Sequence, residues 1–255
     1  MPDEKRIAVF CEGDDDRAVL VRLHAAELLP ARLDIVKRVT ARHGGTEGML
    51  DEWAAGHAPA GMSAVLVRDL DVLEAGQELD WLQRGVSARG FVVMATVPAG
   101  EGPPARRLDV ARGEPVGTAP HSRVTVVAAG LPDAAEIRDR FGLRSFALDD
   151  YVLRLVLDQR IYEQVTEVRT VPHAKALVKL DSFRDEMKAN GLEITQAKRL
   201  LQLLRGITGF RASSATFADR FVEKAVVALG AEATAEVFQP LLRDLHAAAE
   251  LIVSE

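Results

Sequence analysis

The sequence has few of the residues that mark several common classes of protein. Its single cysteine, Cys11, cannot close an intramolecular disulfide, and its place in an apolar run fits a reducing compartment such as the cytoplasm. Aromatic residues make up 5% of the chain, too few for a base-stacking surface to be the leading interpretation. No run approaches the roughly 18 to 20 apolar residues of a membrane-spanning helix, and no signal-type segment follows the charged start. We therefore expect a soluble, cytoplasmic protein.

Excess positive charge is also absent. The 32 Lys and Arg residues are outnumbered by 38 Asp and Glu residues, which gives a formal charge of −6 and excludes a wholly basic surface. Any nucleic-acid contact must therefore be local. The length of 255 residues suggests one or two domains at roughly 150 residues each.

Apolar runs alternate with helical patterns in the first part of the chain. Strands are expected near 6–11, 33–39, 64–67, 91–95 and 124–128, and helices near 18–29, 46–55, 74–85 and 132–141. This alternation predicts an α/β fold with a parallel sheet covered on both faces. Residues 98–120 are rich in Gly, Pro and Arg and predict a long loop or hairpin insertion.

Strand signals stop near residue 145, and four or five helical segments follow. The expected organisation is an α/β domain over 1–145, which includes the Gly- and Pro-rich insertion, and a helical C-terminal region over 146–255.

Two of the expected strands end in acidic clusters. Glu12 is followed by three aspartates at 14–16, and a later strand ends at Asp69 and Asp71. Parallel strands share one carboxyl edge, so these acids are expected to converge there. A Mg²⁺ or Mn²⁺ ion would offset their repulsion, and such a site favours phosphoryl transfer or phosphodiester cleavage. The alternative is that the aspartates cap the following helix and that Asp69 and Asp71 lie in a solvated loop.

The segments VFCEGDDD (9–16) and VLVRDLD (65–71) resemble the TOPRIM domain of topoisomerases, bacterial primases and OLD-family nucleases. The resemblance covers roughly residues 5–100 and implies a Rossmann-like parallel-sheet core. It also implies a role for Glu12 in acid/base or metal chemistry and a metal-holding pair at Asp69 and Asp71. Asp16 matches a further acid that often stands three residues after the glycine.

Two further features resemble the OLD-type and related small TOPRIM proteins. Gly44-Gly45 matches their glycine-bearing loop, although a tight turn would explain it as well. The segment LDDYVL (148–153) resembles their additional metal-binding segment, with Asp149 where a glutamate usually stands, and the resemblance makes Asp149 a candidate metal ligand.

Those nucleases also place a lysine in their C-terminal helices, where it can stabilise charge on the scissile phosphate. Lys198 is the first candidate for this role and Lys175 the second, and either could instead be a solvated helix residue. Arg106 and Arg107 begin a group of arginines around the insertion and, with Lys175, are candidate nucleic-acid contacts. A solvated loop is the alternative for these arginines.

These observations predict a Mg²⁺- or Mn²⁺-dependent TOPRIM-type nuclease whose helical part closes over nucleic acid, with DNA favoured over RNA. The resemblance implies a separate ATPase as partner, in phage defence or repair. The rival hypotheses are a noncatalytic TOPRIM-like binding or effector module and a phosphotransfer domain that uses Asp69. The six histidines have no metal-ligand spacing, so zinc is not expected.

Overall fold

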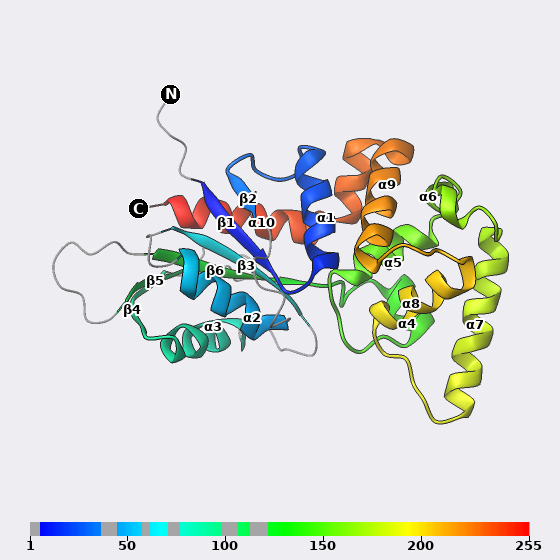
Figure 1. Cartoon of the computed structure of the whole chain (residues 1–255), viewed down its shortest axis with the longest axis horizontal. Helices are drawn as coiled ribbons and strands as arrows, with labels where there is room; N and C mark the ends of the chain where they lie inside the picture. The colour runs from blue at the N-terminus through cyan, green and yellow to red at the C-terminus, as the bar shows by residue number, and fades with distance from the viewer. Residues whose placement is uncertain are drawn as a thin grey trace.

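A six-stranded mixed sheet is built from the first half of the chain (Figure 1). The computed structural model describes residues 6–36, 45–57, 62–70, 77–97, 107–112 and 122–254. The strands are β1 (Ile7–Cys11), β2 (Leu33–Ile35), β3 (Ala64–Asp69), β4 (Phe91–Val97), β5 (Arg107–Arg112) and β6 (Ser122–Ala129), in the order β2-β1-β3-β6-β5-β4. The first four in this order are parallel, and β5 is antiparallel to both of its neighbours. The carboxyl ends of β1, β3 and β6 therefore lie at one edge.

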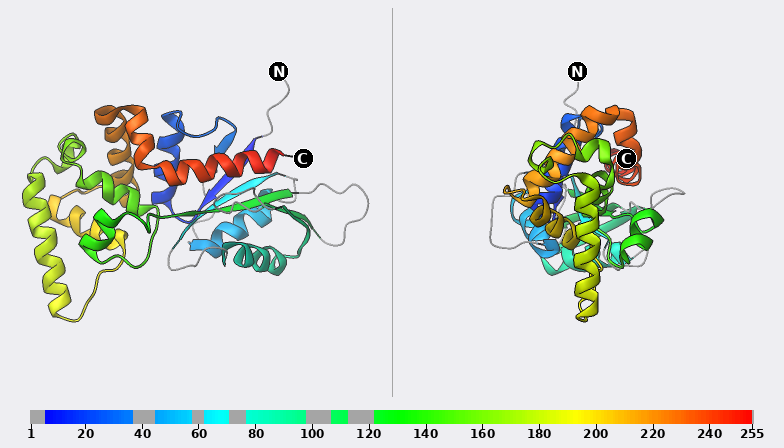
Figure 2. Two further views of the ribbon diagram at one scale, coloured as in Figure 1. Left: turned by 180° about the vertical axis from the view of Figure 1, so that it is seen from behind. Right: turned by 90° about the vertical axis from the view of Figure 1, so that its right-hand side faces the viewer.

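Alternating side chains of the central strands enter two separate cores. Ile7 and Val9 face one core, and Ala8 and Phe10 face the other, because successive residues of a strand point to opposite faces. Helices α1 (Asp14–Ala25) and α10 (Gln239–Val253) cover the first face, and the view from behind shows α10 lying along the sheet (Figure 2). Helices α2 (Gly45–Glu52) and α3 (Gln77–Ala88), with the π-helical turn η1 (Trp53–His57), cover the second.

The remaining helices gather beyond the carboxyl edge of the sheet (Figure 1). They are α4 (Ala135–Phe141), α5 (Asp149–Leu157), α6 (Gln159–Tyr162), the 3-10 helix η3 (Thr166–Val168), α7 (His173–Ala189), α8 (Ala197–Thr208) and α9 (Ser214–Val237). Helix α9 packs along α1, and α10 returns to the sheet against β6. The predicted α/β class with a helical C-terminal portion is thus confirmed. The predicted division at residue 145 marks the end of the strands, but one continuous core joins the two parts.

Some strands and helices differ from the expected ones in their limits, orientation or number. Strand β5 lies inside the stretch rich in Gly, Pro and Arg and pairs antiparallel with β4, which agrees with the hairpin alternative predicted for this stretch, but the sheet is not wholly parallel as expected. Helix α2 begins at Gly45, whose φ of +80° suits glycine, one residue before the expected start. In the fully described stretch 122–254, six α-helices follow Leu148, because α6 is a separate single turn.

Among the described residues no single helix is both long and apolar enough to cross a membrane. The pair α9 and α10 meets these criteria only when both helices are counted together across their 65° bend.

Arg107 has a structural position, so its predicted contact with nucleic acid is wrong. Its side chain is 3% exposed, and Nη1 donates to the carbonyl oxygens of Leu251 (2.7 Å) and Ser254 (2.6 Å) at the end of α10. Its Nε lies 2.7 Å from Asp109 Oδ1. The sheet register also places it four residues before the end of β3, about 13 Å along the strand from the acidic edge. Arg106 lies outside the described residues.

We expect Arg107→Met to lower the free energy of unfolding by about 2–4 kcal/mol, because it leaves a carboxylate and two carbonyl groups without their buried cationic donor. Urea unfolding measures this. Arg112→Met, at the exposed end of the same strand, is the control and should change stability by about 0.5 kcal/mol or less. Equal effects of the two substitutions would contradict the structural role of Arg107.

Candidate functional site at the carboxyl edge of the sheet

The pairing of β1 with β3 brings the two predicted acidic segments together. Cys11, the last residue of β1, pairs with Val67, two residues before the end of β3, so Glu12 lies near the last residue of β3, Asp69. The Asp69 backbone N–H donates to Glu12 Oε1 at 3.3 Å. The Gly45 N–H donates to the Glu12 carbonyl at 3.3 Å, so the start of α2 lies at the same edge. Gly44 and Asp71 lie outside the described residues.

The start of α1 adds Asp16 to this edge. Asp16 Oδ2 accepts a hydrogen bond from the Gly13 N–H at 2.9 Å, which stabilises the first turn of the helix. A Cβ on Gly13 would lie 3.2 Å from Asp16 Oδ2, so glycine allows this close approach. The capping interpretation therefore applies to Asp16, and Gly13 occupies the N-cap position itself.

The start of α5 supplies a third acidic group. Asp149 is 8% exposed, and the Leu148 N–H that precedes it donates to Asp69 Oδ1 at 3.3 Å. The next residue, Asp150, is fully buried, and its Oδ2 accepts from the N–H groups of Leu131 and Ala147, both at 3.0 Å. Asp150 thus holds the backbone before α5 against Leu131 through hydrogen bonds. Of the two aspartates, Asp149 is the one that lies at the acidic edge.

Helices α8 and α9 close the site from the other side. A small cavity of about 20 Å³ is lined by residues of α1, α5, α8 and α9, among them Asp15, Asp149, Lys198, Arg205 and Ser214. Ser214 Oγ donates to Asp15 Oδ1 at 2.7 Å. The charges of Asp15, Asp16, Asp69 and Asp149 all act on Lys198. The cluster therefore joins residues that are almost 200 positions apart in the sequence.

Burial and crowding change the ionisation of these groups. Burial, followed by the charges of Asp69 and Asp149, raises the pKa of Asp16 well above its usual value. Burial likewise raises the pKa of Asp149 to about 7, although the Lys198 ammonium opposes the shift. Burial lowers the pKa of Lys198, but the nearby carboxylates, Asp149 first, outweigh it and raise this pKa overall. Such an arrangement favours binding of a proton or another cation.

Arg68 is a site residue that the sequence analysis did not identify. This residue is 7% exposed, and its Nε lies 4.0 Å from Glu12 Oε1 and donates to the Asp69 carbonyl oxygen at 3.2 Å. The guanidinium carbon is 4.7 Å from the centre of the Trp81 ring. Ser214 was also missed, because only the packing of α9 on α1 brings it to Asp15, an acid that the sequence analysis had placed in the first cluster.

The donor chemistry of the edge fits a hard divalent cation. Five carboxylates, those of Glu12, Asp15, Asp16, Asp69 and Asp149, meet two cationic side chains, those of Arg68 and Lys198. Within the part of the chain that the structure describes, no three His, Cys, Asp or Glu side chains form a ready group around one metal position. Mg²⁺ commonly uses one or two carboxylates with waters and a substrate phosphate, so it does not require such a group.

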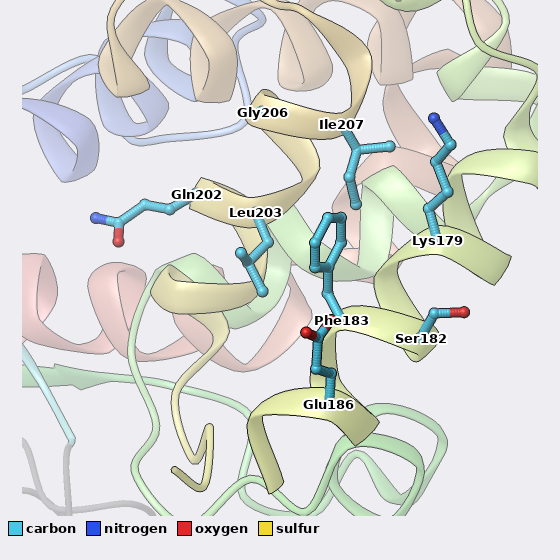
Figure 3. A pocket seen from close by; sticks show the side chains of 8 residues that line it. All are labelled: Lys179, Ser182, Phe183, Glu186, Gln202, Leu203, Gly206 and Ile207. Atoms are coloured by element: carbon cyan, nitrogen blue, oxygen red, sulfur yellow. The ribbon is translucent and has the colours of Figure 1, made fainter. Parts of the chain in front are cut away.

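A wider groove of about 610 Å³ lies between α7 and α8 (Figure 3). Phe183 from α7 points toward Leu203 and Ile207 from α8, whereas Gln202 points away from them. The groove is mainly apolar and contains one lysine and one glutamate, Lys179 and Glu186. We place the candidate site at the smaller cavity, because the carboxylates and Lys198 meet there.

Lys175 is not brought to the acidic edge by any described contact. It is an exposed residue of α7, and the carboxylates that act on Lys198 belong to the first turn of α1, the end of β3 and the start of α5. Of the two lysines, Lys198 is the one beside the predicted metal ligands.

No family model, curated protein or solved structure matches this chain significantly. The geometry of the site is therefore the basis for the functional argument.

The raised pKa of Asp149 predicts that stability decreases as pH rises. The folded protein holds a proton up to about pH 7, whereas the unfolded chain releases it near the ordinary value of 3.8, so folding binds protons between these limits. Asp149→Asn should equal the wild type in stability near pH 4 and exceed it by roughly 3–4 kcal/mol at pH 8.

Chemical unfolding of metal-free protein at several pH values measures this difference. Asp34→Asn, an exposed substitution, is the control and should follow the wild type. A gap between Asp149→Asn and wild type that is the same at every pH would show that burial of the carboxylate charge is not its cause.

Proposed function

We propose that this protein is a divalent-metal-dependent nuclease that cleaves phosphodiester bonds at a TOPRIM-type acidic site and works in the cytoplasm. The observation that carries the proposal is the meeting of Glu12 and Asp69 at the carboxyl edge, with Asp16, Asp149 and Lys198 beside them. Open parallel sheets bind ligands at this edge. The resemblance of segments 9–16 and 65–71 to TOPRIM proteins supports the same reaction.

The side chains have distinct roles in this proposal. Asp16, Asp69 and Asp149 would hold Mg²⁺ or Mn²⁺, and Asp71 is included on the resemblance alone. When bound, the ion would polarise a phosphate group and lower the pKa of an attacking water. Lys198 would stabilise negative charge that develops on the phosphate oxygens. Glu12 would assist at the water or the metal.

Helix α8 is a better candidate surface for nucleic-acid binding than Arg107, which is buried, or Lys175, which has no described contact with the acidic edge. Its charged residues, Lys198, Arg199 and Arg205, are all cations. Among the described residues, none of the three has a carboxylate at salt-bridge distance. A phosphate backbone that follows α8 would lead to Lys198 and the acidic edge. DNA is the favoured substrate over RNA, and a separate ATPase is proposed as partner on the resemblance alone.

A noncatalytic nucleic-acid-binding module is the second candidate. It is favoured by Arg68, which already neutralises one side of the acidic edge, and by the lack of a ready three-residue metal group in the described ranges. This candidate predicts nucleic-acid binding without any metal-dependent product.

Asp69→Ala should reduce metal-dependent cleavage at least about 100-fold, because it removes a carboxylate proposed to hold the ion, and it should leave the fold intact, because the Asp69 carboxylate lies at the edge of the sheet and accepts a hydrogen bond from the Leu148 N–H there. Plasmid, linear DNA and RNA are incubated with Mg²⁺, Mn²⁺ or chelator, and thermal unfolding is recorded in parallel. Asp185→Ala, an exposed substitution on α7, is the matched control. Cleavage by Asp69→Ala at the wild-type rate would remove the nuclease proposal, and binding without products would favour the module.

Arg199→Gln should weaken binding of duplex DNA about 3–10-fold and reduce the salt dependence by about one phosphate contact. Fluorescence anisotropy between 50 and 200 mM salt (on the order of physiological values) measures this in chelator, where no cleavage occurs. Lys175→Gln on α7 is the control and should bind as the wild type does. If only Lys175→Gln weakens binding, the approach along α8 is wrong.

A further inference from the structure

The second half of α7 has little packing within the chain. The buried residues of this 17-residue helix, His173, Ala176 and Leu180, all lie in its first half. Residues 181–189 are partly or fully exposed, and the helix lies at the far end of the molecule in both views from the side of the sheet (Figure 1, Figure 2). Because helices in proteins are stabilised mainly by packing of one face, this half is a candidate contact surface.

The same half of α7 forms one wall of the groove with α8, and the apolar side chains there are open to solvent. Phe183 is 46% exposed although it points toward Leu203 and Ile207 (Figure 3). The groove shares Gln202 and Leu203 with an adjoining groove of about 640 Å³, in which Leu192 is 60% exposed. Large apolar side chains that are grouped and exposed in this way indicate a surface for a partner.

Two opposite charges lie on either side of Phe183 on the α7 wall. Lys179 precedes it and Glu186 follows it, and both line the groove (Figure 3). The two are seven residues apart, about 10 Å along the helix, so they do not reach each other. Both are exposed, and in the described part of the chain neither has an opposite charge at salt-bridge distance. The wall therefore presents a base, an aromatic ring and an acid in that order.

This wall is complementary to itself. A helix that matches it must present an acid, an apolar side chain and a base in the reverse order, and α7 does so when a second copy runs antiparallel to it. With a two-fold axis between Ser182 and Phe183, Lys179 of each copy faces Glu186 of the other. The two Phe183 rings then lie beside the axis. A two-fold interface requires such a self-complementary surface.

The α8 wall contains a glycine that the packing of the chain itself does not require. Gly206 is exposed and is not among the glycines with positive φ, and a Cβ placed on it would have no neighbour within 4 Å. Glycine destabilises a helix relative to alanine. Close approach of a second chain accounts for this glycine, because the absence of a side chain lets a partner come near the backbone of α8.

We propose that the groove between α7 and α8 is a homodimer interface, in which two copies pair their α7 helices antiparallel through Phe183 and through reciprocal ion pairs between Lys179 and Glu186. The interface is small, so we expect a dissociation constant on the order of 10 μM. Gln202 of α8 lines both this groove and the small cavity beside Lys198, so the dimer holds two copies of the candidate site in one particle. The inference does not depend on the proposed nuclease activity.

Sedimentation of the full chain over about 1–200 μM tests the association, and the wild type should change from monomer to dimer in this range. Lys179→Glu and Glu186→Lys should each weaken it at least about tenfold, because each variant places like charges opposite each other. Lys188→Glu, an exposed charge reversal on α7 outside the groove, is the matched control and should associate as the wild type does. A wild type that stays monomeric, or single variants that dimerise normally, would overturn the proposal.

Charge exchange tests the antiparallel arrangement itself. The double variant Lys179→Glu/Glu186→Lys should dimerise as the wild type does, because both ion pairs form again with their charges reversed. An equimolar mixture of the two single variants should form a heterodimer although neither variant pairs with itself. If either experiment fails to restore association, the two side chains do not face each other and the proposed interface is wrong.

Gly206→Ala tests the α8 wall without loosening the fold. Alanine favours the helix, so the monomer should unfold at the wild-type temperature or slightly above it. Association should weaken at least about threefold, because the added methyl group holds the partner away from α8. Gly56→Ala in η1, where a Cβ likewise has no neighbour within 4 Å, is the matched control and should leave association unchanged. Dimerisation of Gly206→Ala at wild-type strength would contradict close packing of the second copy at α8.

Discussion

The register between β1 and β3 is the constraint on which the candidate site depends. With Cys11 opposite Val67, β1 ends two residues before β3 does, and the Glu12 side chain meets the backbone of Asp69, the last residue of β3. Apolar side chains on both faces hold this register, because a shift by one residue would exchange the side chains of the two cores. The hydrophobic packing of the sheet thereby determines the spacing of the acidic groups.

The carboxylates at this edge lie close together, and both hydrogen-bond donors and cationic side chains offset their mutual repulsion. Backbone N–H groups reach Asp16 and Asp69, while Arg68 and Lys198 provide full charges. Burial, together with the neighbouring carboxylates, still raises the pKa values of Asp16 and Asp149. A site with this balance binds protons when it is empty and has a physical reason to bind a divalent cation.

The helical part completes the site and is tied to the sheet by specific contacts. Arg22 of α1 makes two hydrogen bonds of 2.9 Å with Asp219 of α9. At the start of α9, Ser214 Oγ donates to Asp15 in the first turn of α1. Because α10 then packs on the sheet, the helices cannot separate from the acidic edge without exposing a shared core. The position of Lys198 therefore depends on packing of the whole C-terminal half.

The sequence by itself determined the strand ends and the acids that follow them, because apolar periodicity and turn residues act over a few positions. It therefore identified Glu12 and Asp69 as neighbours. Only the tertiary structure decided that Arg68 lies beside Glu12, that Lys198 rather than Lys175 lies at the acidic edge, and that Arg107 is buried under α10. These outcomes depend on how helices distant in sequence pack together, and no local pattern of residues records that packing.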